Sequence, residues 1–196
     1  MQKITFGNLQ SSFAGESQAH VRYTVFAERA KTDGLANIAR LFDAAARSEE
    51  IHAGNHLKAM DGVQDTPSNL TAAAGGEEFE IEEMYPSYIT IAERQAEKRG
   101  MRSMNNALQA EKIHLSLYRK AADDLSAGKD IAKVDYYVCP VCGYTMEGEP
   151  PDVCPICGAR VVPRENLAAT RAVAIPSAVS GAGSETPPAL PTVPRA

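Results

Sequence analysis

The spacing of apolar positions predicts four long helices in the first two thirds of the chain. Apolar residues recur every three or four positions, the period of an α-helix that turns one face toward a core. The four segments cover about residues 8–31, 35–60, 69–99 and 101–126, and turn-forming pairs such as Asp33-Gly34 separate them. Short connections favour antiparallel neighbours, so the pattern predicts a four-helix bundle. Pro86 lies inside the third segment and removes one backbone donor, so a kink is expected there.

Each predicted helix carries one glutamate on its apolar face. A buried carboxylate without a partner is too costly to keep charged, so it needs a cation or a proton. The four glutamates are Glu16, Glu49, Glu77 and Glu111. Around the third of them, the face reads Ala73, Glu77, Ile81, Met84, Tyr88 and Ile91.

Two of these glutamates are followed by a histidine three positions later, His52 and His114. Residues three apart share a helix face. The chain also repeats its spacing, with 33 positions from Glu16 to Glu49 and 34 from Glu77 to Glu111. A helix pair used twice would bring four carboxylates and two imidazoles together. That is the ligand set of di-iron carboxylate bundles, in which two helices give Glu and two give Glu-x-x-His.

The alternative for any single glutamate is a solvated position on a helix surface. This interpretation is kept for Glu78, Glu82 and Glu83, which lie off the apolar face. His20 and His56 lie on the face, and we interpret them as groups beside the metal site rather than ligands.

The four cysteines form a second metal motif. Cys139-x-x-Cys142-Gly and Cys154-x-x-Cys157-Gly are separated by eleven residues, and the glycines allow tight turns around the sulfurs. Four thiolates in tetrahedral array indicate zinc or iron, with disulfides less favoured. Zinc has no redox chemistry, whereas an Fe(SCys)4 site carries single electrons.

Composition limits the class of protein. The chain has 196 residues, 44% of them apolar, and a net charge of −5, which fits one sizeable core plus a small module. The scattered lysines and arginines do not form a nucleic-acid or membrane-surface footprint. No apolar run is long enough to span a membrane and no N-terminal secretion pattern is seen, so a cytoplasmic location is expected.

Taken together, these motifs resemble the rubrerythrin family. The resemblance rests on Gly15-Glu16-Ser17-Gln18-Ala19, Arg22-Tyr23, the stretch from Gly76 to Pro86, both Glu-x-x-His motifs and the paired cysteine turns. It covers residues 5 to about 163 and implies a ferritin-like four-helix bundle followed by a small rubredoxin-like domain. It also implies a peroxidase that reduces hydrogen peroxide to water, with electrons drawn from NAD(P)H. No Gly-x-Gly-x-x-Gly follows a predicted strand, so a separate reductase is expected to bind the nicotinamide.

The resemblance also implies roles for individual residues. Glu80 and His52 would exchange as ligands between oxidised and reduced iron, while Tyr23 and Tyr85 would lie just outside the ligands. A tail module that cannot reach its own di-iron centre would imply a head-to-tail homodimer or higher homo-oligomer. The implied di-iron ligands are Glu16, Glu49, His52, Glu77, Glu80, Glu111 and His114, and the rubredoxin-type iron ligands are Cys139, Cys142, Cys154 and Cys157.

Three domains are expected: a di-iron bundle at 1–128, a rubredoxin-like domain at 129–165 and an Ala/Pro-rich, disordered tail at 166–196. The connection between the two helix pairs is unusually short for the family. Two other functions stay open: an iron-storage ferroxidase of the ferritin type, and a non-enzymatic zinc-ribbon adaptor. The cysteine motif and Glu80 count against the first, and the glutamates on the apolar faces against the second.

Overall fold

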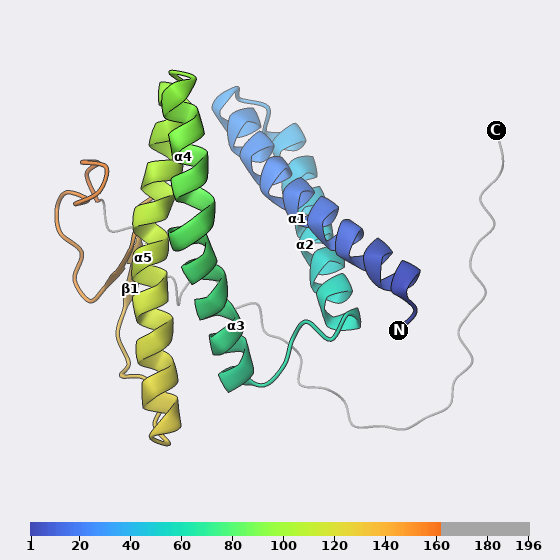
Figure 1. Ribbon diagram of the computed structural model, residues 1–196. Coiled ribbons are helices and arrows are strands. Elements are labelled where there is room, and N and C mark those ends of the chain that lie inside the picture. The colour runs from blue at the N-terminus through green and yellow to red at the C-terminus, as the bar shows by residue number, and fades with distance from the viewer. Residues whose placement is uncertain (162–196) are drawn as a thin grey trace.

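The computed structural model describes residues 1–161, and nearly all of the chain before residue 127 is helical (Figure 1). Helix α1 spans Lys3–Thr32 and α2 spans Ala36–Ala59. A third helical segment comprises α3 (Thr66–Phe79), the π-helical turn η1 (Glu80–Met84) and α4 (Tyr85–Arg94), and α5 covers Lys98–Ser126. The four predicted helical segments are confirmed. The tail expected at 166–196 lies outside the described residues.

The third segment departs from its prediction in two ways. Instead of a simple kink, a π-turn precedes Pro86, in which the Tyr85 N–H bonds the Glu80 carbonyl. Because a proline ring clashes with the carbonyl four residues earlier, the widened turn accommodates it. The segment also ends at Arg94 rather than near Arg99-Gly100, because Ala96 adopts a left-handed conformation (φ 57°) and starts a turn.

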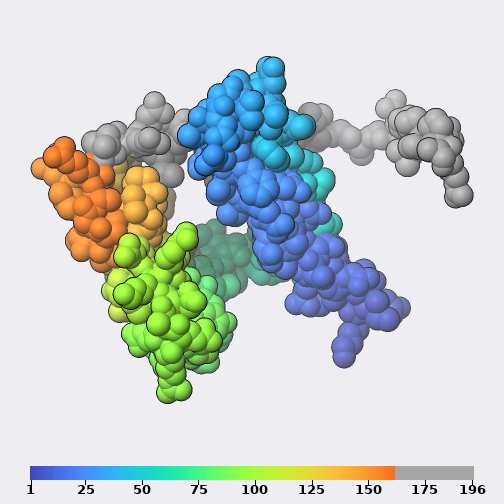
Figure 2. Space-filling model, turned by 90° about the horizontal axis from the view of Figure 1, so that it is seen from above, coloured from blue at the N-terminus to red at the C-terminus, as the bar shows by residue number. Residues whose placement is uncertain are grey.

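The helices form two separate groups. Helices α1 and α2 pack on each other, and α3, η1 and α4 pack on α5, whereas no Cα of α1 or α2 lies within 8 Å of these other helices. Figures 1 and 2 show the two groups as separate masses joined by the connection after α2. Within residues 1–161 of a single chain, therefore, the four helical segments do not pack around one common core.

A small module follows α5. Strand β1 (Tyr136–Val138) pairs antiparallel with β2 (Thr145–Glu147), with Val138 opposite Thr145. Cys139, Met146, Cys154 and Val161 form its buried core. The module lies against α5 (Figure 1), where Lys120 Nζ forms an ion pair with Glu147 Oε1 at 3.0 Å. No helix in residues 1–161 is long and apolar enough to cross a membrane.

We predict that Gly143→Ala destabilises the module by about 1–2 kcal/mol, the cost of a left-handed conformation for a residue with a Cβ. Gly143 has φ 79° with no heavy atom near the added Cβ, so conformation alone sets the effect. Denaturant unfolding followed through the cysteine–iron absorbance would measure it. Gly7→Ala in α1, also open but with ordinary helical φ, is the control and should stabilise α1 slightly. Equal midpoints for Gly143→Ala and the parent protein would contradict the prediction.

Candidate metal centres

The first group of ligating side chains lies between α1 and α2. Oxygens or nitrogens of Glu16, Glu49 and His52 come within 4.8 Å of one another. The hydrogen bond between the two carboxyl groups raises the pKa of Glu16 and lowers that of Glu49. His52 Nδ1 lies 3.4 Å from Glu49 Oε2. We call these three residues half-site A.

His20 helps to align this half-site without joining it. Its Nδ1 lies 2.8 Å from the carbonyl oxygen of Ala46, across the α1–α2 contact. His20 follows Glu16 by one helical turn, and Ala46 precedes Glu49 by about one turn. The bond therefore sets the two carboxylates level with each other, consistent with the predicted supporting role of His20.

The second group lies between α3 and α5 and consists of Glu77, Glu111 and His114, which we call half-site B. His114 Nδ1 lies 2.7 Å from Glu111 Oε2 and 3.7 Å from Glu77 Oε1. Burial, reinforced by the charge and hydrogen bond of Glu111, raises the pKa of Glu77 to about 7. Such a carboxylate needs a proton or a metal ion to neutralise it.

Glu80 and Tyr85 also approach half-site B. Burial and then the Glu111 charge raise the pKa of Glu80, and burial with three carboxylates, Glu80 foremost, raises that of Tyr85. Tyr23 instead stacks among aromatic rings, 6.3 Å from the centroids of Phe26 and Phe42.

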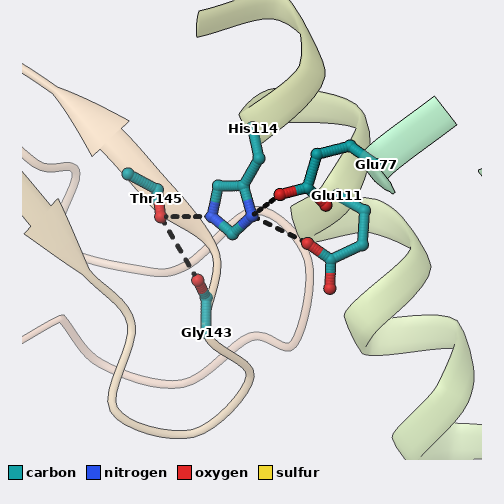
Figure 3. Close-up of polar contacts among 5 residues, drawn as sticks. All are labelled: Glu77, Glu111, His114, Gly143 and Thr145. Carbon is teal, nitrogen blue, oxygen red and sulfur yellow. Dashed lines mark hydrogen bonds and ion pairs between the residues drawn. The ribbon is translucent and has the colours of Figure 1, made fainter. Parts of the chain in front are cut away.

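Two residues near half-site B were not expected from the sequence. Burial and the charges of Glu77 and Glu111 raise the pKa of Tyr118, which lies one turn after His114. Its spacing from His114 could have identified it. Thr145 Oγ1 lies 2.9 Å from His114 Nε2, and its hydroxyl points to the Gly143 carbonyl at 3.4 Å (Figure 3). Thr145 lies 31 positions from His114, so no local pattern indicated it.

This contact corrects one expectation. The module does reach half-site B of its own chain, through β2. The six predicted ligands, in contrast, do not converge within one chain but lie in two groups of three.

The four cysteines gather in the module as predicted. All are free thiols, and their sulfurs lie within 4.8 Å of one another. The Cys139–Cys157 and Cys142–Cys154 sulfur pairs are each 3.6 Å apart, close to the roughly 3.8 Å edge of a tetrahedron with metal–sulfur bonds of about 2.3 Å. Burial opposes ionisation of Cys139, but the N–H groups of Val141 and Cys142 outweigh it and lower its pKa to about 7. Cys139 therefore favours the thiolate, the form that binds metal. Burial instead raises the pKa of Cys142 to about 12 and also raises that of Cys157, so these two thiols need the metal ion itself to hold them ionised.

The chain is similar in sequence to known proteins. Residues 7–122 match the model of the rubrerythrin family, and residues 137–161 match that of the rubrerythrin rubredoxin-like domain. The chain is 42% identical to rubrerythrin-2 of Clostridium acetobutylicum over 80% of its own length and 93% of that protein. It is 35% identical to nigerythrin of Nitratidesulfovibrio vulgaris, covering 78% of this chain and 81% of the relative. A solved structure of fully reduced, all-ferrous nigerythrin has 32% identity, covers 80% of this chain and 83% of that one, and aligns with a TM-score of 0.47.

We predict that Glu111→Ala removes the iron held by the carboxylates while the cysteine site keeps its own. The two sites share no ligand, so their occupancies should separate. Metal analysis together with the thiolate–iron absorbance would measure both. Glu78→Ala is a matched control, because Glu78 follows Glu77 on α3 but pairs with Arg119 at 2.6 Å. Full iron content in the Glu111→Ala protein would refute the ligand assignment.

Proposed function

Because the chain belongs to the rubrerythrin family of di-iron oxidative-stress oxidoreductases, we propose that it is a peroxidase that reduces hydrogen peroxide to water. Its cofactors are a di-iron centre and one iron held by four cysteines. We assign half-sites A and B, with Glu80, as the di-iron ligands. Electrons would come from NAD(P)H through a separate reductase, in the cytoplasm.

The observation that carries this proposal is the position of His114 between the two metal sites. Its Nδ1 faces Glu111 and Glu77, and its Nε2 contacts Thr145 on the cysteine module (Figure 3). Thr145 in turn points to the carbonyl of Gly143, the residue bonded to Cys142. A ligand histidine commonly gives its second ring N–H to such a partner, which fixes the tautomer. The contact between His114 and Thr145 offers a short path of few bonds, along which single electrons could pass from the cysteine site to half-site B.

The chemistry requires two electrons and two protons for each peroxide. When bound, two ferrous ions supply one electron each, so the O–O bond can be broken in a single event. Tyr85 and Tyr118 keep their hydroxyl protons at neutral pH, since burial and nearby carboxylates raise the pKa of both. We assign them to hydrogen-bond the peroxide oxygens and hold protons near them.

Glu80 and His52 are two alternative ligands, and each suits a different redox state of the centre. An anionic carboxylate suits the more positive oxidised centre, and a neutral imidazole suits the reduced one. We propose that these two side chains alternate with the redox state. The His52 side chain is 50% exposed, so its ring has room to move.

A ferroxidase that stores iron is the competing function, and the cysteine site separates the two. Changing Cys139 and Cys142 to serine should abolish the thiolate–iron absorbance and steady-state peroxide turnover with reductase. The pre-reduced variant should still consume about one peroxide per di-iron centre in a single turnover, because the bundle keeps its ligands. Stopped-flow and steady-state assays would measure both rates. Wild-type steady-state turnover in the variant would show that the cysteine site does not deliver the electrons.

We predict that Thr145→Val slows electron transfer between the sites and with it lowers peroxide turnover by about tenfold, the usual loss of activity when a ligand loses its hydrogen-bond partner. Valine keeps the shape of threonine and removes the hydroxyl, whereas Thr145→Ser retains it and should restore the rate. The reoxidation rate of the cysteine-bound iron after mixing reduced protein with peroxide would measure the effect. Equal rates in the valine and serine variants would exclude this path.

A further inference from the structure

A surface pocket reaches the cysteine site at Cys142. Cys139 and Cys154 are almost fully buried, with 2% and 1% exposure, whereas Cys142 and Cys157 are partly exposed. Cys142 lines a pocket of about 450 Å³ between the module and the N-terminal third of α5. A molecule that occupies this pocket therefore comes close to one of the ligand sulfurs.

The wall of the pocket that α5 supplies is basic. Arg99 and Arg102 line it, and both are exposed. Neither arginine forms an ion pair within residues 1–161, whereas Arg119, further along the same helix, pairs with Glu78 at 2.6 Å. Among the described residues that line the pocket, none is an aspartate or a glutamate. The two guanidinium groups therefore leave a local excess of positive charge beside the cysteine site.

The start of α5 adds to this positive charge. The N-terminus of a helix carries the positive end of the helix dipole, which acidic residues usually offset. The first turn of α5 begins with Lys98 and Arg99 and contains no acidic residue. The chain as a whole is acidic, with a net charge of −5. An acidic partner is therefore repelled by the chain as a whole but attracted at this place, which orients its approach.

An exposed apolar side chain lies beside the two arginines. Val141 is 65% exposed and lines the pocket together with Ala107. Interfaces between redox proteins are small, with apolar contacts at the centre and charged residues around them. Arg99, Arg102, Val141 and Cys142 supply both kinds of contact next to a ligand sulfur, and we call these four residues the basic patch.

We propose that the basic patch is the docking surface for the acidic face of the redox protein that supplies electrons to this chain. One electron passes from the reduced partner to the ferric iron held by the four cysteines, and no proton moves. From Cys142 the chain continues to Gly143, whose carbonyl accepts a hydrogen bond from Thr145 at 3.4 Å. Thr145 contacts His114 (Figure 3), so the same cysteine turn receives the electron and passes it on. This inference rests on the proposed function, because it assigns the surface that its separate electron donor uses.

Reduction by an acidic carrier tests the docking. The probe is a chemically reduced plant-type ferredoxin, an acidic one-electron donor of low potential, and stopped-flow loss of the thiolate–iron absorbance measures the rate. The double change Arg99→Gln and Arg102→Gln should lower the second-order rate constant at low salt by about tenfold, because electrostatic steering is lost. The rate constant should also become less dependent on salt. Lysine at both positions keeps the charge and should restore most of the rate.

Two controls separate docking from a change in the cysteine site itself. The double change Arg40→Gln and Lys58→Gln removes the same charge from α2, none of whose Cα atoms lies within 8 Å of β1 or β2, and should leave the rate near that of the parent protein. The methyl viologen radical, a small cation, should reduce the Arg99 and Arg102 variant at least as fast as the parent. Equal ferredoxin rates in that variant and the parent, an equal loss in the α2 variant, or slower reduction by viologen would each overturn the docking.

Binding and oligomeric mass give readouts that do not depend on electron transfer. With zinc in the cysteine site the protein cannot accept electrons, yet calorimetry at low salt should show oxidised ferredoxin binding to it, more weakly after both arginines are changed to glutamine. No binding to the zinc-loaded parent would overturn the proposal. A smaller oligomer in the glutamine variant would place a second copy on the basic patch and overturn it as well. If the protein does not reduce peroxide, the proposed function fails, and the ferredoxin rates and binding still decide the docking.

Discussion

The like charge of neighbouring carboxylates is the constraint on which the rest of this structure depends. Glu16 lies against Glu49 and Glu77 against Glu111, each pair on helices that also carry the apolar faces. Burial and Glu111 raise the pKa of Glu77 to about 7, so the pair in half-site B is costly to keep fully charged without a proton or a cation. A histidine in each half-site adds a neutral ligand but no fixed positive charge. Metal ions neutralise the carboxylates. A centre with ligands from both half-sites would also stabilise contact between the two helix groups.

The second dependence is on helix α5, which serves both metal sites. Its middle carries Glu111 and His114, and Lys120, nearly two turns after His114, pairs with Glu147 of β2. The pairing of β1 and β2 then places Thr145 opposite Val138 and beside His114. A single rigid helix therefore fixes the distance between the sites, and the strand hairpin fixes their orientation. The proposed electron path through His114 and Thr145 depends on both.

Local patterns predicted most of what this structure shows. Helical periodicity located the four helical segments, and (i, i+3) spacing paired Glu49 with His52 and Glu111 with His114, because both depend only on helix geometry. The cysteine spacing likewise predicted a compact site. Thr145 could not be found this way, since its contact with His114 arises from the packing of a hairpin on a helix 31 positions away. The division into two half-sites was also missed, because helical periodicity does not report how two helix pairs are placed relative to each other.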